Sequence, residues 1–200
     1  VQNVQLLGKL LERAQNMPGV EHAARALTVP FWSTWEFSLF VEGIDSVAKL
    51  GEFTIQAATP EFFATMGTRV IRGRAFTAAD GEHAARVMVV GESMAKKIWP
   101  TQDAIGKCVR LNADTMPCVT VIGVAEDVRR GKISETEMHY YMPIAQFHPD
   151  EGGVFVRTRG AAADKADAIR RALQPLMPGV SYVTVTPMST IIAPQIRSWK

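Results

Sequence analysis

This 200-residue sequence lacks long hydrophobic runs and a strong excess of either charge. Its longest apolar run covers residues 119–125, well short of the roughly 20 residues that a membrane helix needs. The 22 lysines and arginines exceed the 20 aspartates and glutamates by only 2. That surplus gives no electrostatic argument for a nucleic-acid or anionic-membrane partner. As it stands, we expect the chain to be soluble.

Motifs of nucleotide binding and hydrolysis are also missing. Neither Gly106-Lys107 nor Gly131-Lys132 has the upstream glycine and the following Ser or Thr of a phosphate-binding loop, so an ATPase would have to lie elsewhere. There is no G-x-S-x-G sequence, and a strand would point the neighbouring carboxylates of Glu126-Asp127 to opposite faces. We therefore predict no catalytic residues, no enzyme and no cofactor.

A metal site is the next possibility. His139 and His148, with Glu137 and Asp150 beside them, carry imidazole and carboxylate groups that transition metals accept. Their spacing fits no ligand pattern, and a polar loop follows His148. We therefore favour solvated loop residues and predict no metal.

A short repeat organises the two ends of the chain. Apolar residues at helical spacing in 3–16 precede Met17-Pro18-Gly19-Val20, and a strand can follow over 20–27. Near the other end a helix with Asp164 as its expected N-cap precedes Met177-Pro178-Gly179-Val180 and a predicted strand over 180–186. A strand over 154–158 would complete a βαβ unit there. Two helix-turn-strand units indicate related halves that pack on one sheet.

The middle of the sequence predicts short strands and brief helices. Alternation over 35–41 and over 53–57 favours strands with one solvated face, and the run 87–90 favours a buried strand. Thr59-Pro60-Glu61 is typical of a helix start with Gly67 as its stop, and 93–99 predicts a second helix. Residues 109–111 and 119–124 look like the arms of a hairpin around Asp114-Thr115.

Together these patterns predict an α+β fold with two subdomains. Residues 1–50 and 138–200 would form a βαβ-containing, pseudo-repeated subdomain from both chain ends. Residues 51–137 would form an inserted, mainly β subdomain.

The central stretches resemble the MacB-type periplasmic core domain of ABC-transporter permeases with FtsX-like membrane helices. No single motif is specific, but their order and spacing together are. The stretches are 59–67 (TPEFFATMG), 72–80 (RGRAFTAAD), 87–95 (VMVVGESMA), 99–100 (WP), 105–107 (IGK) and 121–129 (VIGVAEDVR). A looser resemblance extends over most of the remaining chain, and the opening most resembles the second such domain of permeases in which the unit is duplicated.

The resemblance implies a non-enzymatic module outside the cytoplasm, anchored in the inner membrane of a bacterium. Its expected partners are flanking transmembrane helices of the same chain, a cytoplasmic ABC ATPase domain or subunit, and a second permease copy. The module would couple helix motion to substrate export or to control of a partner. This mechanism requires both chain ends to lie near each other at the membrane side. The sequence starts at Val1 without the charged and apolar regions of a signal peptide, and it ends at Ile196 to Lys200 without a helix stop. We therefore expect it to be a piece of a longer protein.

Cys108 and Cys118 stand symmetrically about the predicted hairpin tip. Residues directly opposite each other on a non-hydrogen-bonded pair bring their Cβ atoms within reach of a disulfide. Two reduced thiols are the alternative, and the cellular compartment decides between them. Because the resemblance implies an extracytoplasmic location, we favour a disulfide, which would be structural because no C-x-x-C spacing is present.

Phe31, Trp32 and Trp35 could form an exposed contact with a partner or with the membrane interface, or they could pack between the two subdomains. We favour packing because large aromatic side chains are mostly buried. The basic clusters at residues 69–74 and 129–132 could form a binding stripe, or they could be solvated edges and turns. We favour solvated edges and turns, because the acids Asp80, Glu126 and Asp127 lie close by in the sequence.

A second class of function remains open, namely a free-standing extracytoplasmic binding protein or enzyme. A deep pocket between the subdomains, lined by convergent polar groups, would favour it, whereas a shallow cleft would favour the permease module.

Overall fold

The computed structural model describes residues 2–129 and 138–197. Within these residues, six α-helices and ten strands in one mixed sheet confirm the α+β prediction. The α-helices are α1 (Gln2–Gln15), α2 (Phe62–Met66), α3 (Glu92–Ile98), α4 (Ile144–Phe147), α5 (Ala162–Leu173) and α6 (Met188–Arg197). The strands are β1 (Val20–Ala26), β2 (Trp35–Glu36), β3 (Leu39–Phe40), β4 (Phe53–Ala58), β5 (Val70–Gly73), β6 (Val87–Gly91), β7 (Cys108–Leu111), β8 (Val119–Ala125), β9 (Met138–Pro143) and β10 (Gly153–Thr158). Short 3-10 turns cover Val47–Leu50 and Gln174–Leu176.

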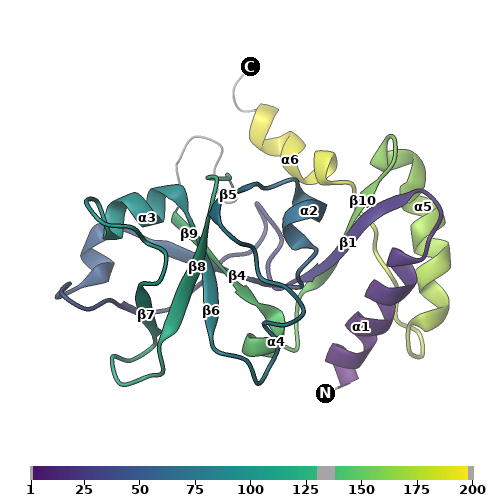
Figure 1. Ribbon diagram of the computed structural model, residues 1–200. Coiled ribbons are helices and arrows are strands. Elements are labelled where there is room, and N and C mark those ends of the chain that lie inside the picture. The colour runs from purple at the N-terminus through teal and green to yellow at the C-terminus, as the bar shows by residue number, and fades with distance from the viewer. Residues whose placement is uncertain (1, 130–137, 198–200) are drawn as a thin grey trace.

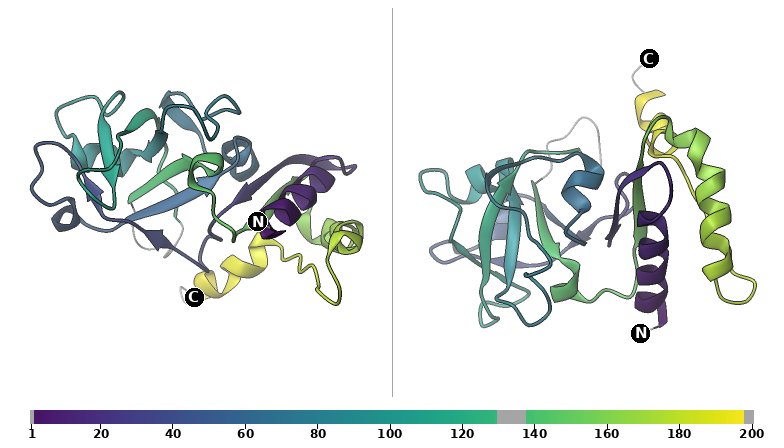
Figure 2. Two further views of the ribbon diagram at one scale, coloured as in Figure 1. Left: turned by 90° about the horizontal axis from the view of Figure 1, so that it is seen from below. Right: turned by 45° about the vertical axis from the view of Figure 1, so that its right-hand side comes forward.

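The molecule has two lobes (Figure 1). The end lobe, residues 2–26 and 150–187, places α1 and α5 side by side on one face of the antiparallel pair β1–β10 (Figure 2). The central lobe, residues 27–149, holds the remaining strands in the described part of the chain. The sheet order is β10-β1-β4-β9-β6-β8-β7-β3, with β2 added to β4 and β5 added to β8. β1 and β4, the strands that join the lobes, are paired only at Ala26 and Ala58.

Strands β4 and β6 form the middle of the central lobe. The continuous apolar sequence of β6 is buried on both faces, as predicted. β4 is also buried throughout, which corrects the expectation of one solvated face. The sequence suggested that face because Thr54 and Gln56 are polar, but both side chains make buried hydrogen bonds.

The second half of the pseudo-repeat differs from the prediction. Residues 180–186 are not a strand, although Val183 and Val185 are half-buried and their neighbours are exposed, as in a strand. The Gln174 carboxamide donates to the Ser181 carbonyl at 2.8 Å and accepts from the Val183 N–H at 3.1 Å. Asp164 lies within the first turn of α5 rather than at its N-cap, which is Ala161.

Two further boundaries needed correction. The strand expected over 35–41 is divided into β2, which pairs with β4, and β3, which pairs with β7. Residue 61 is the N-cap of α2, so the helix begins later than Thr59-Pro60 suggested. Gly67 ends α2 at φ 74°, as expected, and a Cβ there would lie 2.8 Å from an Arg157 guanidinium nitrogen. The helix 92–98 and the hairpin β7–β8 agree with the prediction.

The domain boundaries at 50/51 and 137/138 remain a prediction. The packing favours a proposal with boundaries near 26/27 and 149/150. Leu39, Val41 and Val47 belong to the same buried cluster as Met94. In addition, β9 pairs with both β4 and β6 inside the central lobe.

The expected adjacency of the chain ends concerns Val1 and Lys200, which lie outside the described residues. In Figure 1, α1 begins at the lower pole of the molecule and α6 ends at the upper pole. Along the described residues, α6 leads away from the body, and Met188 packs against the cluster around Phe62. None of the helices described here is both long and apolar enough to span a membrane.

Candidate functional site

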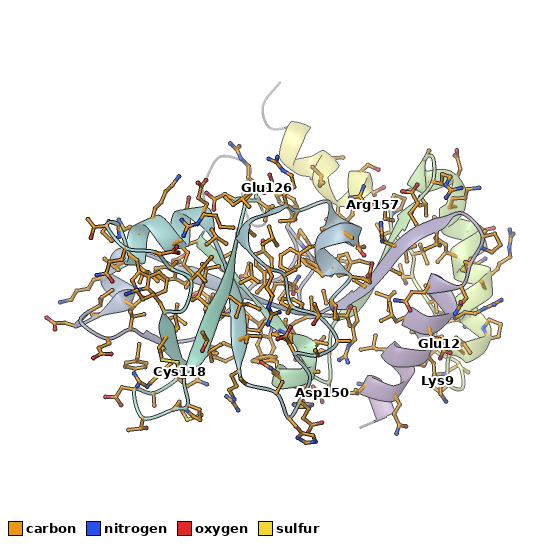
Figure 3. The ribbon with its side chains drawn as sticks, in the orientation of Figure 1. Lys9, Glu12, Cys118, Glu126, Asp150 and Arg157 are labelled. Carbon is orange, nitrogen blue, oxygen red and sulfur yellow. A yellow bond between two sulfur atoms is a disulfide. The ribbon has the colours of Figure 1, made fainter. Side chains whose placement is uncertain are left out.

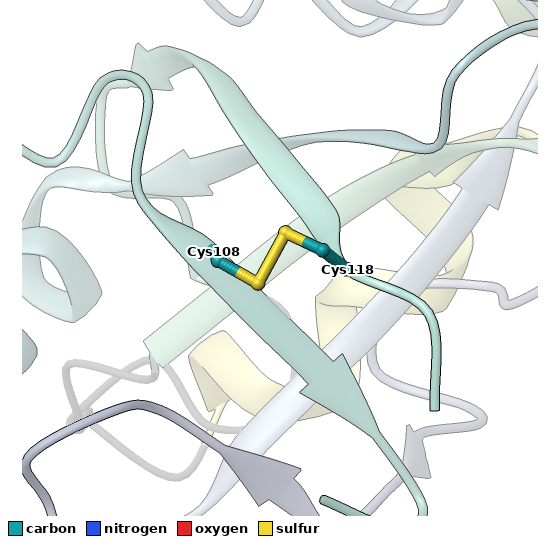
Figure 4. Close-up of a disulfide and its surroundings, with 2 residues drawn as sticks. All are labelled: Cys108 and Cys118. Atoms are coloured by element: carbon teal, nitrogen blue, oxygen red, sulfur yellow. A yellow bond between two sulfur atoms is a disulfide. The ribbon is translucent and has the colours of Figure 1, made fainter. Parts of the chain in front are cut away.

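The structure bonds Cys108 to Cys118, with Cα atoms 5.4 Å apart (Figure 4). The two cysteines are not directly opposite, as the sequence suggested, because Cys108 pairs with Thr120 and Val109 with Val119. The bond is therefore diagonal and joins two side chains on one face of the hairpin. It fixes β7 on β8, and β7 in turn holds β3 at the edge of the sheet.

The aromatic segment 31–35 is more exposed than we expected. Trp32 is 75% exposed and Trp35 is 36% exposed, so packing between the lobes is wrong for Trp32. Phe31 is half-buried and adopts a φ of 65°, a left-handed conformation that is uncommon outside glycine. It is Phe37, a residue that the sequence analysis did not single out, that anchors this segment, by packing edge-on against Phe147 at 5.4 Å.

The two histidines considered as metal ligands, His139 and His148, each contact other side chains or backbone groups. His139 is buried, with its Nδ1 2.6 Å from Thr54 Oγ1 and its Nε2 2.9 Å from the Val128 carbonyl. Because a carbonyl only accepts, Nε2 donates and Nδ1 accepts from the Thr54 hydroxyl. His148 lies on the surface 3.5 Å from Glu82, and residue 137 is outside the described part of the chain. The described residues contain no group of three metal-binding side chains.

The arginines of β5 and its neighbours pair with acidic side chains. Glu126, labelled in Figure 3, directly follows β8. Arg69 donates two hydrogen bonds to it, and these bonds lower the pKa of the Glu126 carboxyl. Arg74 forms a two-pronged pair with Asp80 at 2.7 and 2.8 Å. Asp127 instead accepts from the Ser93 N–H at the start of α3. Residues 130 and 132 of the second basic cluster lie outside the described residues.

The two lobes meet in an aromatic junction that sequence reasoning missed. The Phe62 ring of α2 is 6.3 Å from Phe155 of the end lobe and 6.0 Å from Tyr141 of the central lobe. The neighbouring Phe63 ring packs against Tyr141 and Phe76 of the central lobe. Ala24 and Ala26 of β1 belong to the same buried cluster. The TPEFFATMG motif therefore has a structural explanation, because it places Phe62 in contact with both lobes and Phe63 in the same buried cluster.

Polar contacts accompany this junction where the chain crosses between lobes. The Gln56 carboxamide, fully buried, accepts from the Thr28 N–H at 2.9 Å and donates to the Thr28 carbonyl at 2.9 Å. Arg25 is 7% exposed and donates to the Pro149 and Glu151 carbonyls, and burial lowers its pKa. Gly152 has no room for a side chain, since a Cβ would lie 2.4 Å from the Ala26 carbonyl oxygen. No sequence pattern pointed to Gln56, because its partners lie far along the chain.

Two hollows lie within the lobes and not between them. One, of about 140 Å³, lies beside α3, with Trp99 and Val124 among its apolar residues and Arg72 and Lys96 among its charged ones. The other, near Gly19 and Ile169, is only about 20 Å³. Neither hollow opens at the aromatic junction, where buried aromatic rings bring residues of the two lobes into contact.

Comparison with known proteins places these features in a family. Residues 3–176 match the family described as MacB-like periplasmic core domain. No curated protein matches the chain. Among solved structures, the periplasmic region of MacB from Actinobacillus actinomycetemcomitans is similar, with a TM-score of 0.67, 15% identity, and coverage of 97% of this chain and 82% of that one. The extracellular domain of the noncanonical ABC-type transporter YknZ from Gram-positive bacteria has a TM-score of 0.59, 18% identity, and coverage of 84% and 80%.

Proposed function

The chain belongs to the family of MacB-like periplasmic core domains, and from this premise we propose that it is the extracytoplasmic domain of an ABC-transporter permease. The observation that carries the proposal is the extent of the family match, which runs over both lobes and the junction between them. The domain acts without catalysis of its own. Its partners are the membrane helices of the same polypeptide, an ABC ATPase domain or subunit in the cytoplasm, and a second copy of the permease.

The aromatic junction supports a role in coupling. Because Phe62 touches residues of both lobes inside one buried cluster, a displacement of the end lobe moves the central lobe with it. The hollows within the lobes give no comparable support to a free-standing binding protein, whose ligand we would place between the lobes.

Labelling in intact cells tests the location. Tyr182 is 83% exposed in the end lobe, and Trp32 is 75% exposed in the central lobe. In the full-length permease, Tyr182→Cys or Trp32→Cys should react with a membrane-impermeant maleimide before the cells are opened. The unsubstituted permease is the control for any cysteines outside this domain, because the two cysteines of the domain are joined to each other. Labelling that appears only after the inner membrane is permeabilised would overturn the proposal.

Distances between spin labels test the coupling. Tyr182→Cys labels in two copies of the assembled permease should change their separation when ATP is added. The separation between labels at Tyr182 and Trp32 within one copy should stay constant, because the junction holds the lobes together. Separations that are all unaffected by ATP would contradict the coupling role while leaving the location intact.

A further inference from the structure

The outer edge of β10 is open in the described structure, where this strand pairs with β1 and with no other strand. Alternate residues of a strand direct their N–H and C=O groups toward each neighbour, so half of those on β10 face away from β1. Residues 180–186 belong to the end lobe, but they form no strand ladder with this edge. An unpaired strand edge of this kind is a template for another strand.

The side chains around this edge are covered incompletely. In the cluster beneath α1 and α5, only Leu10, Ala14, Ala23, Ile169 and Leu173 are buried. The remaining apolar members are half-buried: Leu6, Leu7, Leu11, Met17, Val20, Val154, Val156, Leu176, Met177, Val183 and Val185. They come from α1, from β1 and β10, from the turns that follow α1 and α5, and from residues 183–185. Both β10 and residues 183–185 therefore carry apolar side chains that are incompletely covered.

The internal repeat indicates what fits there. In the second unit, a strand (β10) precedes the helix (α5), and β10 pairs with β1, the strand that follows the helix of the first unit. If the two units are related by a twofold rotation, the equivalent partner is a strand preceding α1, paired with the segment that follows α5. That strand would lie between β10 and residues 180–186.

We propose that the outer edge of β10 binds an extended strand formed by the residues of the parent polypeptide that lead into α1. Its apolar side chains would cover Val154 and Val156 on β10 and Val183 and Val185 opposite them. It would run antiparallel to β10 and parallel to β1, as a strand joined to β1 through α1 must do for the crossover to pack on the sheet.

The direction of this strand also accounts for the position of the chain ends. α1 begins at the lower pole in Figure 1, so a strand that enters α1 there starts near the upper pole, where α6 ends. A strand of six residues, the length of β10, spans about 20 Å at roughly 3.3 Å per residue. Both connections to the membrane would then leave from one pole. This consequence depends on the proposed function, whereas the strand itself is inferred from the open edge and the repeat.

Amide hydrogen exchange tests the proposal. The 200-residue chain is compared with a parent fragment that keeps about 15 additional residues before α1, enough for a strand and a turn. In the shorter chain, the β10 amides directed away from β1 should exchange rapidly. In the longer one they should exchange at least about tenfold more slowly. Amides of β6, which pairs with β8 and β9, should be protected equally in both, which shows that both are folded.

A matched control uses the same additional residues in shuffled order, which should leave β10 unprotected. Outward amides that are already protected in the dilute shorter chain would overturn the proposal, because residues 180–186 would then close the edge themselves. Protection that appears only as the concentration of the shorter chain rises would overturn it in favour of a second copy. No gain in protection from the native extension would overturn it as well. None of these results bears on the membrane location, which the maleimide experiment tests separately.

Discussion

The central lobe and the end lobe are built from similar apolar residues, but only the central lobe closes around them. The cluster that includes Ile55, Met88 and Met94 is mostly buried, with a few half-buried residues at its margin. In the end lobe the proportion is reversed, and half-buried residues outnumber buried ones. In the described residues, the end lobe is therefore incompletely packed, whereas the central lobe has a core of its own.

In the described residues each terminal strand of the sheet, β3 and β10, has one strand partner, and the two edges differ in how that partner is held. The β3 edge belongs to the central lobe, and the disulfide between Cys108 and Cys118 holds the hairpin next to it. The β10 edge belongs to the end lobe, and the described residues offer it no strand partner beyond β1. Stability is therefore expected to be concentrated in the central lobe.

The largest effect should come from a cavity in the central cluster. Ile55 is fully buried between β2 and β9, so Ile55→Ala should lower the free energy of unfolding by about 2–5 kcal/mol. Leu11→Ala in α1 is the matched substitution in the end lobe. Because Leu11 is half-buried, it should cost about 1 kcal/mol or less. Urea unfolding followed by circular dichroism measures both.

If Ile55→Ala and Leu11→Ala lowered the free energy of unfolding equally, the contrast between the lobes would be contradicted. The end lobe would then be as well packed as the central lobe. A parent fragment that includes the proposed strand before α1 provides a second test of the contrast between the lobes. There the cost of Leu11→Ala should rise toward that of a buried leucine, while the cost of Ile55→Ala should not change.

The same contrast explains which parts of the fold could be predicted from the sequence. The run Val87–Val90, the helix 92–98 and the β7–β8 hairpin carry strong local signals, and local signals suffice when the surrounding core is complete. The strand predicted over 180–186 has an equally strong alternating pattern. It failed because a strand also needs a neighbour, and a neighbour is not a property of the segment itself.

The candidate site was less predictable because its contacts join distant residues. The sequence paired Cys108 with Cys118, which are close along the chain. It could not reveal that Gln56 would satisfy the backbone of Thr28, or that Phe62 would reach Phe155. General burial tendencies also misplaced Trp32, since a tendency of tryptophan says nothing about a particular loop.

The next largest effect concerns the disulfide in the hairpin next to the β3 edge. Cys108→Ser/Cys118→Ser opens a covalent loop whose cysteines are 10 residues apart, which should cost about 2–3 kcal/mol of unfolding free energy. Reduction of the unsubstituted protein with dithiothreitol should cause a similar loss, and the double variant should not respond to the reagent. A double variant as stable as the parent would show that this edge is held by packing alone.

A smaller effect, with a defined pH dependence, comes from the ion pairs. Hydrogen bonds from Arg74 lower the pKa of Asp80 to about 2 from an ordinary value of 3.8, and its side chain is only 8% exposed. A pKa lowered by folding adds stability above the unfolded value, and this stability disappears as the pH falls through the folded value. Asp80 should therefore contribute about 2 kcal/mol at pH 7, lost between about pH 4 and pH 2.

Asp80→Asn isolates this contribution, because the variant should be less stable at pH 7 and should approach the unsubstituted protein near pH 2. The matched carboxylate in the end lobe is Asp167 on α5. Hydrogen bonding to Arg170 also lowers its pKa, but the pair lies in solvent. Asp167→Asn should therefore change the pH profile of urea unfolding far less than Asp80→Asn. A change as large as that of Asp80→Asn would mean that Asp167 lies in a less solvated environment than its exposure indicates. That result would contradict the contrast between the two lobes.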